Sequence, residues 1–140
     1  HIGFPELLGA AALALCPGGH LFIYTRTREQ NAGSVWGRHF PGFAERETRL
    51  YSQEQMMAWA KGSEHFRHGE FVPFSYQRSA SLDKLLRLVR AHHYSTFSLY
   101  GADELEAAIA GFEANLRREY ADMEHVEWQD GNLMAHLRRK

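Results

Sequence analysis

The polar segment Thr25–Asn31 carries the residues of this sequence that are best suited to bind a ligand. It contains two threonines, two arginines, a glutamate, a glutamine and an asparagine. It directly follows the apolar run Leu21–Tyr24, which is typical of a strand covered on both faces of a sheet. Because open α/β sheets bind ligands beyond the carboxyl ends of their strands, we expect this segment to face a substrate. The competing interpretation is a solvated loop in which Thr25 or Thr27 caps a helix.

Other groups of reactive residues lack the neighbours that their chemistry requires. His65 and His68 have the spacing of a metal-binding pair, but they flank a predicted strand, and no third ligand accompanies them or the pair His92-His93. No Gly-x-Ser-x-Gly motif marks a serine nucleophile, although another arrangement of serine, histidine and aspartate stays open. Cys16 ends a predicted helix, where the helix dipole disfavours a thiolate. We therefore predict no metal site and name no catalytic residue.

Composition indicates one globular domain of 140 residues with a substantial core, because 44% of the residues are hydrophobic and 24% are charged. A net charge of -1 argues against a nucleic-acid partner or a membrane surface. The arginine clusters, such as Arg117-Arg118, favour solvated helix faces over an RNA site. The single cysteine rules out an internal disulfide and fits a cytoplasmic location, and no apolar run has the length that a bilayer span needs.

Hydrophobic periodicity and capping residues predict the main elements of the fold. Ser52 and Gln55 form a capping box, Ser81 caps a further helix, and Pro73 confines its strand to a sheet edge or ends it. Asp130-Gly131 favours a bulge or bend within the last strand. We expect helices over residues 5–15, 53–61, the segment after Ser81 and residues 103–120, and strands over residues 21–24, 66–76 and 124–137.

The order of these elements predicts an α/β fold with a partial Rossmann-like sheet. We expect about three strands, the last of them antiparallel, and four or five helices. The segment Thr25–Arg49 is rich in glycine and charge, and we interpret it as an excursion over the sheet edge, with some short helix, rather than as a core element.

The segment Leu13–Ile23 contains Leu15-Cys16-Pro17-Gly18-Gly19 followed by an apolar strand. It resembles the leucine-x-proline-glycine-glycine segment of class I S-adenosylmethionine-dependent methyltransferases, which joins the fourth crossover helix to the fifth strand. Residues 66–76 and 133–137 then resemble the sixth strand and the antiparallel seventh strand of that family. The resemblance implies that the seventh strand inserts between the other two.

The family's glycine-rich cofactor loop and its acidic ribose-binding residue have no counterpart here. The chain therefore resembles only the C-terminal, substrate-side half, with the N-terminal cofactor-binding half absent. The complete enzyme would use S-adenosylmethionine, and this chain alone is expected to bind none. By position in the family, the residues near the cofactor would be His1, Ile2 and Phe4. Those lining the acceptor pocket would be Tyr24, Thr25, Arg26, Thr27, Arg28, Asn31 and Trp36.

Without the preceding half, the strand Leu21–Tyr24 would expose an unpaired apolar edge, and such edges recruit partners. We predict that a homodimer or the missing N-terminal half covers it. Two alternatives remain. The chain is a non-catalytic oligomerising or ligand-binding α/β module derived from such an enzyme, or it is a small α+β binding domain in which the Pro-Gly-Gly turn is a coincidence.

Overall fold

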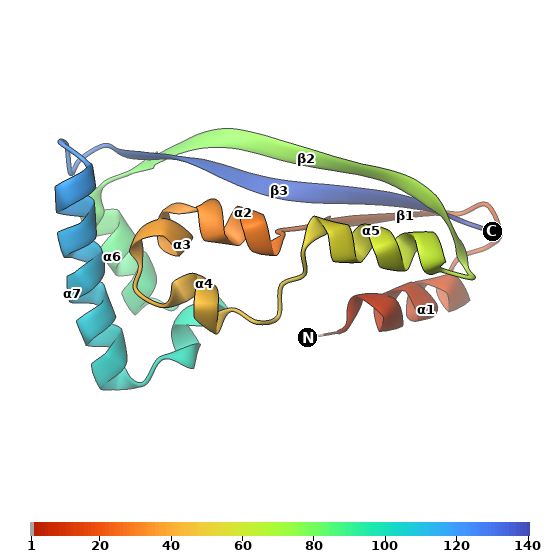
Figure 1. The fold of residues 1–140 in the computed structure, drawn as a ribbon, viewed down its shortest axis with the longest axis horizontal. Helices are drawn as coiled ribbons and strands as arrows, with labels where there is room; N and C mark the ends of the chain where they lie inside the picture. The colour runs from red at the N-terminus through yellow and green to blue at the C-terminus, as the bar shows by residue number, and fades with distance from the viewer. Residues whose placement is uncertain (1) are drawn as a thin grey trace. The chain divides into compact units, whose positions relative to one another are not determined.

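The computed structural model describes residues 2–140, apart from the side chain of residue 68. Its contacts divide the chain into two compact units. Unit 1 comprises His1–Glu29, Arg49–Phe74 and Gly131–Lys140, and unit 2 comprises Gln30–Thr48 and Ser75–Asp130. The elements, labelled in Figure 1, are α1 (Phe4–Ala14), β1 (His20–Thr25), α2 (Arg28–Gly33), α3 (Val35–His39), α4 (Phe43–Arg46), α5 (Gln53–Gly62), β2 (Phe66–Ala80), α6 (Leu82–Arg90), the 3-10 helix η1 (Ser95–Leu99), α7 (Ala102–Glu119) and β3 (Val126–Arg139).

The predicted α/β class is confirmed, and so is the predicted place of the last strand. The described residues form one three-stranded sheet in the order β1-β3-β2 (Figure 1). β3 runs antiparallel to β1, with Phe22 opposite His136. The hydrogen bond from Lys140 N to His65 O joins the end of β3 to the start of β2, as expected for an antiparallel pair. Pro73 lies in β2, which is an edge strand as its proline predicts.

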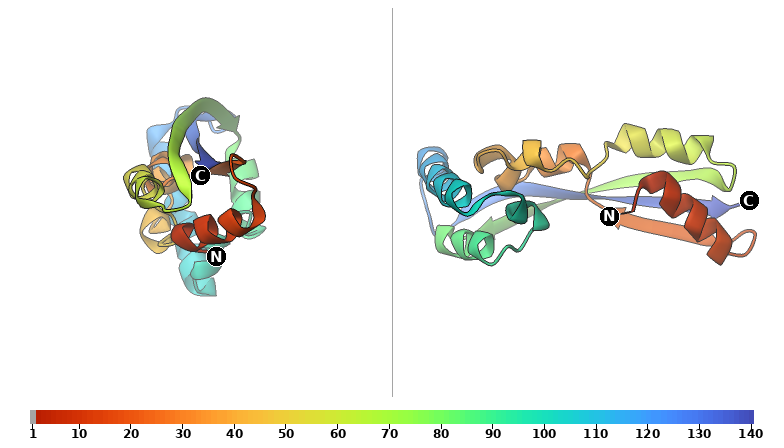
Figure 2. Two further views of the ribbon diagram at one scale, coloured as in Figure 1. Left: turned by 90° about the vertical axis from the view of Figure 1, so that its right-hand side faces the viewer. Right: turned by 90° about the horizontal axis from the view of Figure 1, so that it is seen from below.

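In unit 1, α1 and α5 pack on one face of the sheet (Figure 2). Ser52 begins α5 with the predicted capping box, in which its hydroxyl accepts from Gln55 N and Gln55 Oε1 accepts from Ser52 N. Burial of apolar side chains from both helices and two strands holds this layer together. The buried residues of this core are Phe4, Leu8, Ala12, Met56, Ala60, Phe66, Leu133 and Leu137.

Unit 2 has a core built around aromatic rings. The ring of Trp36 lies 5.1 Å from that of Phe112 and 5.3 Å from that of Phe97, and all three residues are buried. Phe40 and Phe43 join this cluster. The interpretation of Thr25–Arg49 as an excursion outside the core is therefore wrong: its short helices α3 and α4 contribute large buried rings. The helix predicted over residues 103–120 is present as α7, and its apolar stripe is buried: Leu105, Ala108, Ile109, Phe112 and Leu116.

β1 corrects a second expectation, because it is not covered on both faces by the described residues. Phe22 is 61% exposed and Tyr24 is 64% exposed, while their neighbours Leu21 and Ile23 are half-buried. The reason is that the helices of unit 1 pack against only one face. In β3, alternate residues are buried from Val126 to Asp130, and the alternation changes phase at Gly131, as expected for a bulge at the predicted place.

Candidate functional site

A small cavity of about 120 Å³ opens at the carboxyl end of β1, within unit 1. Its wall is largely apolar and is formed by Ile2, Phe4, Leu7, Ile23, Leu50 and Met56. Thr25, Arg26, Arg49 and Tyr51 complete the lining. The cavity thus brings together Ile2 and Phe4, which the family resemblance places near the cofactor, with Thr25 and Arg26, which it places near the acceptor.

Hydrogen bonds hold two walls of the cavity in place. Arg28 donates its backbone N–H to Tyr51 O at 2.9 Å and its guanidinium to Leu50 O at 3.1 Å. Asn132 of β3 donates its side-chain amide to Thr25 O at 3.3 Å. Arg28 therefore orients the segment that carries Leu50 and Tyr51.

Ring packing supports the same walls from behind. Phe4 is 4% exposed, and its ring lies 6.0 Å from that of Trp59. Tyr51 meets Trp59 edge to face at 4.9 Å. The α1 and α5 sides of the cavity are thereby joined through one tryptophan of α5.

Two arginine side chains line the cavity. Arg26 and Arg49 are half-buried, and no carboxylate residue is among the described residues that line the cavity. A guanidinium keeps its charge at every physiological pH, and its planar set of N–H donors suits carboxylate and phosphate groups.

The other predicted site residues lie elsewhere. Thr27 is 2% exposed, and the guanidinium of Arg28 donates to the backbone oxygen of Leu50, as described above. Asn31 and Trp36 are buried in unit 2, where Trp36 belongs to the aromatic core. Tyr24 points to the exposed face of β1, with its ring 6.4 Å from that of Phe74. His1 lies outside the described residues.

Sequence reasoning missed the contribution of the segment before α5. Arg49, Leu50 and Tyr51 line the cavity together with Met56. One signal was available: Tyr51 and Met56 flank the capping box of α5 in the positions of a hydrophobic staple, and such a staple fixes how the chain enters a helix. Nothing in the local pattern, however, indicates that this entry lies beside the end of β1.

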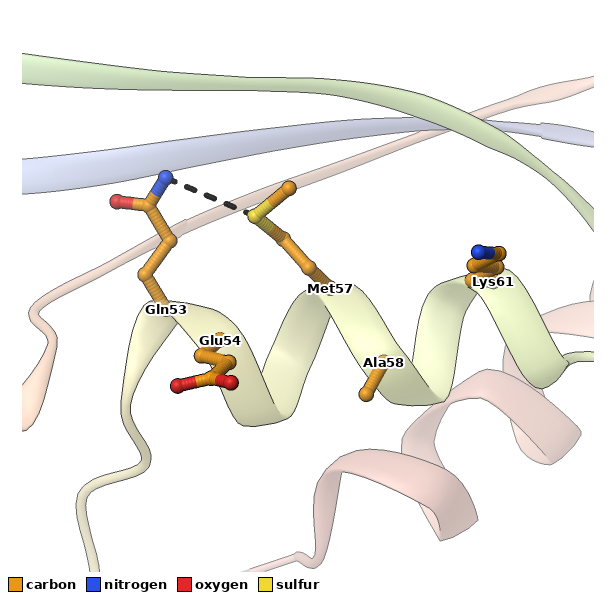
Figure 3. Close-up of a pocket in the computed structure, with 5 residues that line it drawn as sticks. All are labelled: Gln53, Glu54, Met57, Ala58 and Lys61. Atoms are coloured by element: carbon orange, nitrogen blue, oxygen red, sulfur yellow. Dashed lines mark hydrogen bonds between the residues drawn. The ribbon is translucent and has the colours of Figure 1, made fainter.

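Two larger hollows in unit 1 are less suited to bind a specific ligand. One has about 690 Å³, and the described residues that line it all belong to α5, with Gln53 and Met57 on one side of the helix and Glu54 and Ala58 on the other (Figure 3). A surface formed by a single helix encloses little. The second, of about 340 Å³, lies between α1 and α5 beside Trp59.

The clearest pKa shifts do not mark the cavity. Burial raises the pKa of Tyr100 to about 12, and this hydroxyl donates to Pro41 O in unit 2. Burial also lowers the pKa of His39, again in unit 2. Among the described side chains, no three His, Cys, Asp or Glu residues come together as metal ligands.

No protein-family model matches this chain, and a search of curated proteins found no matching sequence. Along the described part of the chain, no helix has the length and apolar character that crossing a membrane requires.

Proposed function

We propose that this chain is the substrate-side portion of an S-adenosylmethionine-dependent methyltransferase and requires a cofactor-binding half to act. The observation that carries the proposal is the strand order β1-β3-β2, with β3 antiparallel to β1. The Pro17-Gly18-Gly19 turn leads into β1, and Gly18 adopts a φ of 80°, which favours glycine. The resemblance to class I methyltransferases implies both the turn and this insertion of the last strand.

The cavity at the end of β1 supports the same proposal. Residues that would face the cofactor, Ile2 and Phe4, share it with Thr25 and Arg26 on the acceptor side. Methyl transfer depends mainly on alignment, because the nucleophile must meet the methyl carbon in line with the sulfur. An aromatic wall such as Phe4 suits a sulfonium cation. In this proposal the chain shapes the acceptor side and the other half holds the cofactor.

The proposal includes a partner for β1. This strand lies at the edge of the sheet, and its side chains Phe22 and Tyr24 are exposed. Edge strands with apolar side chains are sites of further pairing or packing. The cofactor-binding half, or a second copy of this chain, covers them in a cytoplasmic assembly.

A second candidate function rests on the same exposed rings. In this alternative the chain is a non-catalytic α/β module, derived from a methyltransferase, that oligomerises through β1. The exposed rings of Phe22 and Tyr24 favour this alternative, because association through them would need no cofactor.

The intact mass and N-terminal sequence of the native gene product distinguish the two candidates. The methyltransferase proposal expects a glycine-rich strand–loop–helix ahead of these residues, or on a separate chain that co-purifies in equal amount. A native product consisting of the same 140 residues, with no such chain bound to it, contradicts the enzyme proposal and favours the oligomerising module.

A further inference from the structure

We infer that β1 pairs with β1 of a second copy of this chain, antiparallel and about a twofold axis at Phe22, so that the two sheets join into one. The inference rests on the part of the proposed function that gives β1 a partner, and it names that partner and the register of the pairing. The residues that carry the pairing all belong to unit 1.

The backbone of β1 is open on one side. This strand lies at the edge of the sheet, and within the described chain it pairs with β3 alone. Arg139 N donates to Gly19 O at 2.8 Å, so the carbonyl of Gly19 points to β3. Because this direction alternates along an antiparallel strand, the N–H and C=O groups of His20, Phe22 and Tyr24 point to the open edge. A further strand would find its donors and acceptors there.

The same three residues carry the exposed side chains of β1. Residues directly opposite each other in a sheet point to the same face. If Phe22 lies opposite Phe22 of the second copy, His20 lies opposite Tyr24, and all these side chains share the face that the helices of unit 1 leave free. The two Phe22 rings then form a cross-strand aromatic pair, which stabilises a sheet. β1 is therefore complementary to itself in this register.

No charge opposes the pairing. β1 contains none of the residues that commonly protect a sheet edge, namely charged residues and proline. In the proposed register Arg26, which follows the strand, lies opposite Gly18 of the second copy, so like charges do not meet. The net charge of the chain is only -1, and two copies therefore repel each other weakly.

The opposite edge of the sheet differs in this respect. β2 forms that edge and contains Pro73 as well as the charged residues Arg67, Glu70 and Arg78. A proline removes a donor from the edge, and charged side chains disfavour the approach of another strand. The contrast between the two edges selects β1 as the strand that pairs.

Amide hydrogen exchange, followed by NMR at low and at high chain concentration, tests the inference without any substitution. The amides of His20, Phe22 and Tyr24 should exchange at least tenfold more slowly at high concentration, because the second copy accepts their hydrogen bonds. The amides of Leu21 and Ile23, which point to β3, should be protected alike at both concentrations. An equal change in both sets, or no change in either, overturns the inference.

Disulfide formation tests the register, in a Cys16→Ser background because Cys16 is the only cysteine. Phe22→Cys should give a disulfide-linked dimer on mild oxidation, because opposite residues have Cα atoms about 5.5 Å apart, within the range of a disulfide. His20→Cys alone should not, because its two copies would lie roughly 14 Å apart. A mixture of His20→Cys and Tyr24→Cys chains should link to each other. Linkage at residue 20 alone, or no linkage in any sample, contradicts the register.

A proline substitution tests the backbone. Phe22→Pro removes the N–H that points to the open edge and leaves the donors of Leu21 and Ile23 to β3 in place. Phe22→Thr is the matched control, because it also loses the ring but keeps the N–H. Sedimentation equilibrium should show at least tenfold weaker association for the proline variant than for the threonine variant. Thermal melts verify folding, and Tyr24→Pro with Tyr24→Thr replaces the pair if Phe22→Pro is unfolded. Equal association of folded variants overturns the inference.

The pairing and the enzyme proposal fail separately. If residues 20, 22 and 24 gain protection with concentration but the native gene product transfers no methyl group, the pairing stands and the enzyme proposal fails. If the native product transfers a methyl group while these amides show no dependence on concentration, the enzyme proposal stands and the pairing is overturned.

Discussion

The two units differ in the sheet face that their helices leave free. In unit 1 this face carries His20, Phe22 and Tyr24 from β1, beside His136 of β3, and the ring of Phe22 stacks on that of His136 at 4.5 Å. We call these four residues the aromatic face. In unit 2 the exposed positions of β2 and β3 are mainly polar, with Tyr76 as an exposed aromatic exception. Ser75 bonds to Gln129 and Gln77 to Glu127 across the strands.

The difference indicates that the two faces have different environments. A face of hydrogen-bonded polar pairs suits water. A face of neighbouring aromatic rings keeps apolar area exposed, and contiguous exposed apolar area in a folded protein commonly marks an interaction surface. Because β2 and β3 contribute to both units, strand propensity alone does not account for the contrast. This contrast supports the proposal that a partner covers the aromatic face.

The largest expected effect contrasts a buried ring with an exposed one. Phe112→Ala removes a fully buried ring from the core of unit 2 and should lower the free energy of unfolding by about 3–5 kcal/mol. Phe22→Ala, in the aromatic face, should change it by less than about 1 kcal/mol, because surface substitutions usually have small effects. Urea denaturation measures both. If the two variants lose equal stability, Phe22 is not a free surface residue.

Self-association should depend on the aromatic face. The double substitution of Phe22→Thr and Tyr24→Thr keeps strand propensity while it removes two exposed rings. Sedimentation equilibrium should show that the original chain associates and that this variant associates at least tenfold more weakly. The matched control, Gln77→Thr with Gln129→Thr in unit 2, should associate like the original chain. A chain that is monomeric at every concentration contradicts association through β1.

Helix caps offer a smaller, balanced comparison. Ser52 caps α5 in unit 1, and Ser81 caps α6 in unit 2, where its hydroxyl accepts from Lys84 N at 3.2 Å. Alanine at either position should lower the free energy of unfolding by about 1 kcal/mol, the usual value for a lost N-cap. Urea denaturation of the two variants measures these losses. A loss several times larger at one serine would show that its role exceeds capping.

The pH dependence of stability should have a contribution from His39 of unit 2. Burial lowers the pKa of His39 in the folded state. This pKa is therefore below the ordinary value that His39 has in the unfolded chain. At a pH above both pKa values, the ring of His39 is neutral in the folded state and in the unfolded state. As the pH falls through the unfolded value, the unfolded chain takes up a proton first, so the folded state loses stability.

Urea denaturation between pH 8 and pH 5 measures this loss. His39→Gln should show a shallower decrease than the original chain as the pH falls. His65→Gln is the control, because His65 is exposed, and its decrease should match that of the original chain. An unchanged slope in His39→Gln would contradict a neutral, buried His39.

Much of the fold could be predicted from sequence because its signals are local. Ser52 and Ser81 predict the starts of their helices because serine is a common N-cap, and the apolar stripe of α7 extends over a helix of 18 residues. Trp36 and Phe43 were missed as core residues because α3 and α4 have only five and four residues, too few for a helical period. The exposed side of β1 was missed because coverage of a strand depends on elements distant in sequence.

The candidate site was predictable on one side only. Thr25 and Arg26 follow an apolar strand, which is a general position for ligands in α/β sheets. Arg49 and Leu50 reach the same cavity through a contact between segments more than twenty residues apart, held by the backbone bond of Arg28 to Tyr51. No periodicity or motif in one sequence indicates such a contact.

Calorimetric titration of S-adenosylmethionine tests the central claim most directly, when it is done in parallel on the native gene product and on residues 1–140 alone. The account predicts micromolar binding by the native product and no measurable binding by the isolated chain. Micromolar binding by residues 1–140 alone, or no binding by the native product, would contradict it.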